Sequence, residues 1–282
     1  MFGAETFEEL ERIASDSGNS VNRFCISQIK KALGSRSKHK SFGLDPIHTT
    51  FQGGKEMPLQ NWYPYLEGYS PDFVSYIIDN YIGQGAKVIY DPFSGTGTTP
   101  ITASAAGYTA YYSEVNPLLQ FLTRVKAKAR SIDNRKKITG KIDDLIKKIE
   151  REILRSVADQ ELKKTYDETF GESKFFTDEV FNKILRTKTY LNQLYFQDVL
   201  LCDLVTVAVL SSLVENSLLK RQGDLRFRRG KEMEELDGVE YFESIRNRLR
   251  RISEDLKVLK PGPAPVLVTE DARAIGNLPF LG

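Results

Sequence analysis

The chain has few cysteines and histidines, and this scarcity limits the kinds of site that it can hold. Its 282 residues include two cysteines, Cys25 and Cys202, and two histidines. Two cysteines so far apart do not form a disulfide framework, and no Cys/His cluster has the spacing of a zinc site. Both cysteines stand in segments that resemble apolar helix faces. We therefore expect neither a disulfide-stabilised fold nor a metal centre.

Long apolar runs and a strong net charge are also lacking. The nearest candidate for a membrane span, residues 196–219, is interrupted by Asp198, Asp203 and Glu215. Residues 1–9 are acidic and lack the basic region and apolar core of a signal peptide. The net charge is only +2, which excludes a wholly basic DNA-binding surface but not local basic patches. We expect a cytoplasmic protein without membrane segments, built of one large or two modest domains.

The most informative stretch is residues 88–99, which read Val-Ile-Tyr-Asp-Pro-Phe-Ser-Gly-Thr-Gly-Thr-Thr. The apolar start is typical of a strand, and Gly95 and Gly97 allow a tight turn that approaches a ligand closely. Thr98 and Thr99 are suited to cap a following helix. A strand, a glycine loop and a helix N-terminus in series form the arrangement that a nucleotide-like cofactor needs. The pattern is neither a P-loop, which needs Gly-Lys-Ser/Thr, nor a dinucleotide fingerprint, which needs a third glycine.

A second strand-like run, residues 108–113, ends at Glu114. A carboxylate at the end of the next parallel strand is suited to accept both hydroxyls of a ribose. Around these two runs the sequence predicts alternating elements, which indicate an α/β fold with a parallel sheet and crossover helices. The expected elements are a helix over 71–84, a strand near 87–91, a helix near 97–106, a strand near 109–113 and a helix near 116–129.

Residues 91–99, followed by Ser-Glu-Val-Asn-Pro-Leu at 113–118, resemble motifs I and II of the S-adenosylmethionine-dependent DNA methyltransferases that modify exocyclic amino groups. These enzymes methylate adenine N6 or cytosine N4, commonly in restriction-modification systems. The resemblance implies a Rossmann-like methyltransferase fold with a partial sheet. It also implies that the glycine loop would hold the methionine part of S-adenosylmethionine, and that Glu114 would hold the ribose. The loop residues expected at the cofactor are Asp91, Pro92, Phe93, Ser94, Gly95, Gly97 and Thr98.

Two further segments are similar to motifs of the same family. Residues 62–74 are similar to motif X, which lies against the cofactor and here includes Tyr65. Residues 265–273 resemble motif III, in which an acid, here Asp271, receives the exocyclic amine of the cofactor's adenine. Each segment also has a purely structural interpretation. The first reads as an aromatic loop packed on a core helix, and the second as a strand that ends in a solvated turn.

The catalytic motif of this family, Asp/Asn/Ser-Pro-Pro-aromatic, is not found, because the chain contains no Pro-Pro dipeptide. It also has no Pro-Cys pair of the kind that C5-cytosine enzymes use. We therefore assign no catalytic residue, and expect a chain that binds S-adenosylmethionine and DNA but needs a second polypeptide to methylate. Two alternatives stay open, an RNA amino-methyltransferase and a non-catalytic interaction subunit.

The remaining sequence is mostly of helical type. We expect a helical N-terminal extension and linker over 1–60, the cofactor-binding part over 61–130, a helical insertion over 131–260 and a further sheet strand over 261–282. Within the insertion we expect one apolar helix over 194–219 and an amphipathic helix over 239–259. A third helix is indicated by an apolar stripe made of Ile138, Ile142, Leu145, Ile149 and Ile153.

One segment of the insertion, residues 216–231, carries six basic side chains and one acid, and its two glycines predict a loop. Its basic side chains are suited to contact nucleic-acid phosphates. The candidates for such contacts are Lys220, Arg221, Arg226, Arg228 and Arg229. The alternative is a charged surface loop that the acidic run 232–235 partly neutralises. A second basic group, Arg246, Arg248, Arg250 and Arg251, is better explained by ion pairs with Glu243, Glu254 or Asp255.

Overall fold

The computed structural model describes residues 12, 50, 54, 57–65, 68–83, 85–222 and 224–277. The chain divides into two compact units, residues 1–44 and 45–282. Nearly all described residues belong to the second unit, and every element named below lies in it. The extension expected over 1–60 falls almost entirely outside the described residues, as does Cys25. The domain boundaries near residues 60, 130 and 260 stay predictions.

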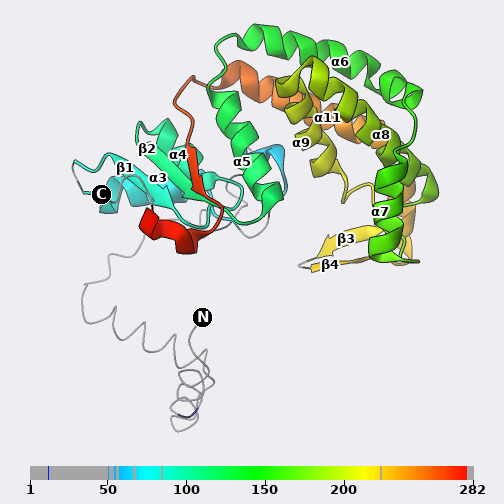
Figure 1. The fold of residues 1–282 in the computed structure, drawn as a ribbon, viewed down its shortest axis with the longest axis horizontal. Helices are drawn as coiled ribbons and strands as arrows, with labels where there is room; N and C mark the ends of the chain where they lie inside the picture. Colours follow the sequence, from blue (N-terminus) through cyan, green and yellow to red (C-terminus); the bar gives the residue numbers. More distant parts are fainter. Residues whose placement is uncertain are drawn as a thin grey trace. The chain divides into compact units, whose positions relative to one another are not determined.

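Three parallel strands form a small sheet in the order β1-β2-β5 (Figure 1). They are β1 (Val88–Asp91), β2 (Thr109–Ser113) and β5 (Val266–Thr269). Val88 pairs with Thr109, and Tyr111 pairs with Val266. Although β5 follows β2 by about 150 residues, it pairs with β2 in the same sheet. The segment predicted over 265–273 thus contains a strand, at Val266–Thr269.

Two helices cover one face of this sheet. They are α3 (Pro71–Tyr81) and α4 (Thr98–Ala105), and α4 connects β1 to β2. Their contact with the sheet is an apolar cluster of Val74, Ile78, Ala103 and Ala110. The start of α3 is as predicted, because the Ser70 side chain accepts the Phe73 N–H and a proline occupies the first turn.

The helix cap predicted at Thr98 and Thr99 is wrong. Gly97 occupies the N-cap position of α4 with a left-handed backbone, φ 86°, and no side chain caps the helix. The two threonine hydroxyls bond elsewhere, Thr98 to Gln60 Oε1 and Thr99 to Tyr69 Oη. They thereby fix the segments that precede the glycine loop in the sequence.

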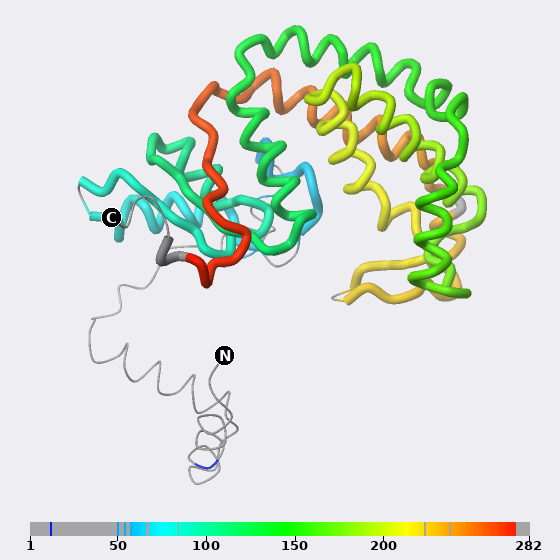
Figure 2. The backbone as a smooth tube through the Cα atoms, viewed as in Figure 1, coloured from blue at the N-terminus to red at the C-terminus, as the bar shows by residue number. Residues whose placement is uncertain are grey.

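Most of the chain between β2 and β5 is helical, as the tube in Figure 2 shows. Helix α9 lies among α5, α6, α8 and α11 and is buried along most of its length. All five members of the predicted stripe on α6 are buried. The helices are α5 (Pro117–Arg130), α6 (Arg135–Arg155), α7 (Gln160–Phe170), α8 (Asp178–Gln197), α9 (Val199–Ser212), α10 (Lys231–Asp237) and α11 (Tyr241–Val258).

Two predictions for this region are corrected. The single helix over 194–219 is broken at Asp198, which adopts an extended backbone and accepts the Leu201 N–H at 3.0 Å. Its carboxylate caps α9 and so separates α9 from α8. The loop expected over 216–231 contains an antiparallel hairpin of β3 (Leu219–Gln222) and β4 (Asp224–Phe227), in which Arg221 faces Leu225.

A short segment before α3 joins the helical part to the glycine loop. It contains the 3-10 helix η3 (Gln60–Trp62). The Asp255 carboxylate on α11 accepts hydrogen bonds from Leu59 N at 3.1 Å and from Trp62 Nε1 at 2.7 Å. Burial raises the pKa of Asp255. This buried acid therefore fixes the segment on α11.

Candidate cofactor site

The acidic residues predicted at the cofactor meet at one edge of the sheet. Asp91 ends β1, Glu114 follows β2, and Asp271 follows β5 just before the 3-10 helix η4 (Ala272–Asn277). The strands are parallel, so their carboxyl ends lie at the same edge, which is where ligands bind in such sheets. A cavity of about 440 Å³ opens there. Its lining is Pro92, Phe93, Glu114, Val115, Glu270, Asp271, Ala272 and Arg273.

The cavity thus brings together four predicted residues, Pro92, Phe93, Glu114 and Asp271. Sequence reasoning missed Val115 and Arg273, although Val115 directly follows Glu114 and Arg273 stands two residues after Asp271. Two apolar side chains of the lining are unusually exposed, Phe93 at 80% and Val115 at 76%. A mostly apolar cavity with a few acidic groups and exposed apolar side chains at its lining is typical of a site for a flat, partly apolar ligand.

The glycine loop is held in a conformation that requires glycine at one position above all. Gly95 and Gly97 both have positive φ, 55° and 86°. A Cβ atom at Gly97 would lie 2.7 Å from Thr123 Cγ2, which is a clash. At Gly95 the nearest atom to such a Cβ is in the Tyr65 ring, at 3.4 Å. Tyr65 therefore lies against the loop, although it does not line the cavity.

Glu114 shapes the loop directly. Its Oε2 accepts the Gly95 N–H at 2.8 Å, and its Oε1 accepts the Asn116 N–H at 2.9 Å. The residue is only 8% exposed. Each carboxylate oxygen has a second lone pair, so acceptor capacity remains for a ligand hydroxyl. One carboxylate thus orients the loop and keeps acceptor capacity for a further donor.

Asp91 and Ser94 complete the loop in different ways. Asp91 Oδ1 accepts the Phe93 N–H at 3.0 Å, which fixes the turn after β1. Ser94 is buried, yet its Oγ has no hydrogen-bond partner among the described residues. Buried hydroxyl groups nearly always have a partner, and a missing one needs an explanation. A polar ligand held by this loop would supply the missing partner, so the residues present are compatible with a bound cofactor.

Helix α5 also holds the main chain of the loop, through two side chains. Lys126 is buried, and its Nζ donates to the Thr96 carbonyl oxygen at 2.8 Å. Thr123 Oγ1 donates to the Gly95 carbonyl oxygen at 3.3 Å. Burial lowers the pKa of Lys126 to about 7. The sequence signal for Lys126 was available, because it stands four residues after Leu122 on the buried face of the helix.

Asp271 lines the cavity, and Arg273 pairs with it through Nη2 at 2.6 Å. The hydrogen bonds from Arg273 lower the pKa of Asp271 to about 2. The carboxylate is thus ionised at neutral pH and acts only as an acceptor. An exocyclic amine is a donor that such an acceptor would suit.

The basic side chains of the hairpin differ in how they are held. Lys220 pairs with Glu232 and Glu235, and Arg226 binds Glu232 at 2.7 Å. Arg228 donates to main-chain carbonyl oxygens of the preceding turn. The side chains of Arg221 and Arg229 are exposed and pair with no carboxylate among the described residues, although the Arg229 main-chain N–H donates to Glu232 Oε2 at 3.1 Å. The acidic run therefore neutralises part of the basic segment, and the predicted phosphate contacts stay predictions.

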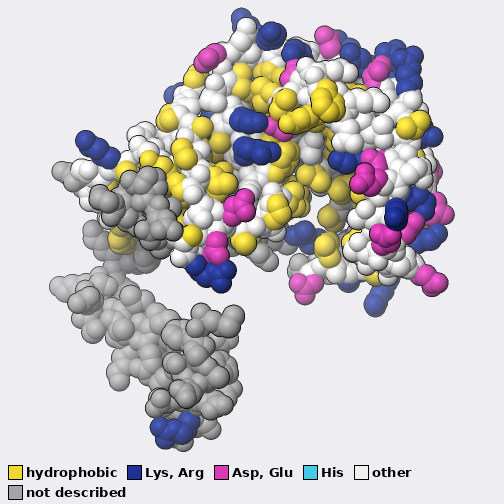
Figure 3. Space-filling view, viewed as in Figure 1, with side chains coloured by type: hydrophobic (Ala, Val, Ile, Leu, Met, Phe, Trp, Pro, Cys, Tyr) yellow, Lys and Arg dark blue, Asp and Glu magenta, His cyan; other side chains and the backbone are white. Residues whose placement is uncertain are grey.

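The second basic group, on α11, is paired much as expected. Arg246 and Arg250 both bind Glu243. Arg248 differs from the prediction, because its partner is Glu215 at 3.0 Å. Figure 3 shows Lys and Arg side chains scattered among Asp and Glu on the face in view, with no single basic surface.

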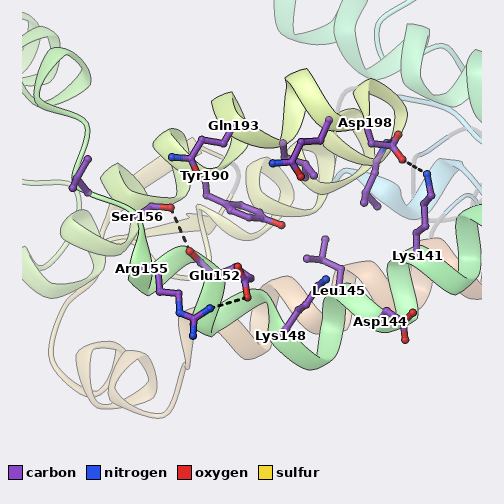
Figure 4. A pocket seen from close by; sticks show the side chains of 14 residues that line it. Lys141, Asp144, Leu145, Lys148, Glu152, Arg155, Ser156, Tyr190, Gln193 and Asp198 are labelled. Carbon is purple, nitrogen blue, oxygen red and sulfur yellow. Dashed lines mark hydrogen bonds and ion pairs between the residues drawn. The ribbon is translucent and has the colours of Figure 1, made fainter.

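The largest described cavity is a groove of about 550 Å³ between α6 and α8 (Figure 4). Lys141 pairs with Asp198 at one end, and Arg155 pairs with Glu152 at the other. The lining has three basic and three acidic side chains, so the groove has no excess charge. No residue predicted from the sequence to bind a ligand lies in it.

Among the described residues, no helix is long and apolar enough to cross a membrane. Within the same part of the chain, no group of three or more His, Cys, Asp and Glu side chains is arranged to hold a metal ion. Cys202 is a buried free thiol on α9, as its apolar context predicts.

Comparison with known proteins shows similarity to parts of Type II methyltransferases. M.AvaI of Nostoc sp. (strain PCC 7120 / SAG 25.82 / UTEX 2576) is 35% identical over 104 residues, which are 36% of this chain and 22% of that protein. M.BsoBI of Geobacillus stearothermophilus is 32% identical over 69 residues, which are 24% of this chain and 14% of that protein.

A third relative, the Type II methyltransferase M.MjaII of Methanocaldococcus jannaschii, is 27% identical over 124 residues, which are 43% of this chain and 22% of that protein. No family model and no solved structure matches the chain. The matched segments span less than a quarter of each relative's length, and over those segments this chain is similar to Type II methyltransferases.

Proposed function

We propose that this chain is the S-adenosylmethionine-binding part of a DNA methyltransferase that modifies an exocyclic amino group, in a restriction-modification system. One observation carries the proposal: Asp91, Glu114 and Asp271, the acids of the three motif-like segments, meet at the carboxyl edge of one parallel sheet. The similarity to Type II methyltransferases supports the same reaction class.

The sheet supports a Rossmann-like fold. Its strands run β1, β2, β5 in space, which matches the first three strands of one half of a doubly wound sheet. In such folds the ligand binds outside the carboxyl ends of the strands. The cavity described above lies at that edge, beside the glycine loop.

Each site residue has a proposed task toward the cofactor. The glycine loop and Ser94 would hold the methionine part, Glu114 the ribose hydroxyls, and Asp271 the adenine amine. Phe93 and Val115 are suited to lie on either side of the adenine, because both are apolar and exposed at the cavity. Bound S-adenosylmethionine supplies an already activated methyl group, so the protein's contribution is to orient it.

The target would be a base in DNA, which must leave the stack before its amino group is accessible. The 282 residues contain no Pro-Pro-aromatic sequence to bind that amino group. We therefore propose that a second polypeptide, or a further part of the same gene product, carries it. Reading the genomic DNA after codon 282 for a frame that encodes such a sequence tests this part of the proposal.

The cofactor part is tested by calorimetry with S-adenosylmethionine. We expect micromolar binding by the wild-type chain and at least tenfold weaker binding by Asp271→Asn. Glu254→Gln, on α11 and outside the site, is the matched control and should bind as the wild type does. Absence of cofactor binding by the wild type would refute the proposed function. Methyl transfer to DNA by the purified chain alone would refute the need for a second polypeptide.

A further inference from the structure

We propose that a second, basic pocket beside the hairpin binds a backbone phosphate of duplex DNA, with Arg221 as its main ligand. The pocket has a volume of about 230 Å³ and lies between residues 63–64, the end of α9 and strand β3. This inference rests on the proposed function, since it names the surface by which the same chain would hold its DNA.

The charge of this pocket favours an anion. Four basic side chains line it, and the single acid is Glu215. Arg248 already pairs with that acid at 3.0 Å. The groove between α6 and α8 balances its charges, and the cofactor cavity has more acids than bases. The basic pocket therefore differs from both in having a clear excess of positive charge.

The basic side chains of the pocket have separate roles. Arg228 donates to the carbonyl oxygens of Ser217 and Glu215 at 3.1 and 3.3 Å, so it fixes the turn between α9 and β3. Lys220 is held by the acids of α10. Arg221 is exposed and has no carboxylate or carbonyl partner among the described residues. Its guanidinium is thus available to take two phosphate oxygens at once.

A short segment, residues 63–65, connects the pocket to the glycine loop. Tyr63 and Pro64 line the pocket, and the ring of Tyr65 lies against Gly95 of the glycine loop. Two residues of extended chain span about 7 Å at most. Trp62 precedes this segment and donates a hydrogen bond to Asp255, which attaches the segment to α11. The segment that lines the pocket thus continues directly into the residue that contacts the glycine loop.

An extended polyanion fits this surface better than a small phosphate does. The pocket is open, and Arg229 follows β4 of the same hairpin with an exposed side chain that pairs with no carboxylate among the described residues. Successive phosphates on a strand are suited to use both arginines. Contacts of this kind position DNA without reading its sequence, and they make binding depend on salt.

The test measures binding of the full chain to a fluorescent DNA duplex at several salt concentrations. We expect Arg221→Gln to weaken binding about tenfold and to reduce the salt slope by about one. Affinity for S-adenosylmethionine and the melting temperature should stay as in the wild type. Lys147→Gln is the control, because it removes a charge of equal sign from an exposed ion pair on α6. It should change neither the affinity for the duplex nor the salt slope.

An unchanged salt slope in Arg221→Gln, or no binding of duplex by the wild type, would overturn the inference. Competition by inorganic phosphate at millimolar concentration would show a small-anion site instead, and stronger competition by structured RNA would show an RNA surface. Failure of the proposed function looks different: the wild type then binds no S-adenosylmethionine, while an Arg221-dependent salt slope can persist.

Discussion

Lys126 donates a hydrogen bond from its Nζ to the carbonyl oxygen of Thr96 at 2.8 Å, from a position that is 1% exposed. Thr96 stands between the two glycines of the loop, so a buried lysine on α5 holds the main chain of the proposed cofactor site. Buried lysines rarely stay fully charged, because burial disfavours the ammonium form. Here burial lowers the pKa of Lys126 to about 7.

This pKa predicts a change of stability with pH. The unfolded chain keeps Lys126 protonated up to about pH 10.5, whereas the folded chain releases the proton near pH 7. Between these values the unfolded state binds more protons, so the free energy of unfolding rises with pH, by at most about 1.4 kcal/mol per unit. Below pH 7 both states are protonated and this contribution is constant.

The comparison that isolates this effect is Lys126→Met. The variant should lack the rise between pH 7 and 10, because it has no titrating group at this position. Urea unfolding of both proteins at several pH values measures the difference. A parallel pH dependence in the two proteins would show that Lys126 does not titrate in this range.

The left-handed backbone of the loop makes a second prediction, for Gly97→Ala. The new methyl group would lie 2.7 Å from Thr123, at a φ of 86°. We expect a loss of about 1–3 kcal/mol in the free energy of unfolding, and loss of S-adenosylmethionine binding. Gly171→Ala is the matched control, because Gly171 also has positive φ but nothing within 4 Å of its added Cβ.

The control variant should lose some stability through backbone strain alone and keep its cofactor affinity. Calorimetry with S-adenosylmethionine and urea unfolding measure both quantities. Equal cofactor affinity in Gly97→Ala and the wild type would mean that the close contact of Gly97 with Thr123 is not needed for the site.

The parts of the site that the sequence predicts are those encoded locally. The segment from β1 to α4 is continuous, so its strand, glycine turn and helix follow from neighbouring residues. The place of β5 followed from the motif resemblance, since no local signal tells a strand which partner it will pair with after a long insertion. Tertiary contacts determine the parts of the site that local sequence does not predict, such as the cap of α4. Thr98 has a good cap side chain, but its hydroxyl bonds to Gln60 instead.

The errors in the helical part have similar causes. Apolar composition predicts helix through residues 194–219, yet one carboxylate, Asp198, takes the Leu201 N–H and begins a new helix. The basic segment reads as a loop because of its glycines and charges. Its strands form because Arg226 and Lys220 lie opposite each other and share the carboxylate of Glu232, which offsets their repulsion. The sequence predicts that the acidic run partly neutralises this segment, but only the structure shows that Glu232 is the carboxylate that the two strands share.

Glu114→Gln tests the double role of this carboxylate. The wild-type side chain accepts two main-chain N–H groups, of Gly95 and Asn116. A glutamine offers one oxygen, and its amide NH₂ would face the other donor. We expect a loss of about 1–3 kcal/mol in the free energy of unfolding, and much weaker binding of S-adenosylmethionine.

Glu270→Gln is the control for charge, because Glu270 lines the same cavity, is exposed and forms no hydrogen bond with the loop. It should leave stability unchanged. If both variants weakened cofactor binding equally, the acidity of the cavity, and not the hydrogen bonds of Glu114, would be the important property.

Asp255 gives the last prediction, because its carboxylate connects the helical part to the loop through Trp62 and Leu59. Asp255→Ala leaves two buried N–H donors without an acceptor, which should cost about 2–4 kcal/mol in the free energy of unfolding. Trp62 is the only tryptophan of the chain and is 2% exposed, so its fluorescence reports on this segment alone. The emission of folded Asp255→Ala should shift to the red as the indole becomes hydrated.

Asp255→Asn keeps an acceptor oxygen for the same two donors, so it should preserve the emission maximum and most of the stability. The segment that Asp255 fixes also places Tyr65 against Gly95 and Tyr63 in the basic pocket. Asp255→Ala should therefore weaken the binding of S-adenosylmethionine and of duplex DNA together, although Asp255 lines neither site. Loss of one affinity without the other would show that the two sites are supported independently.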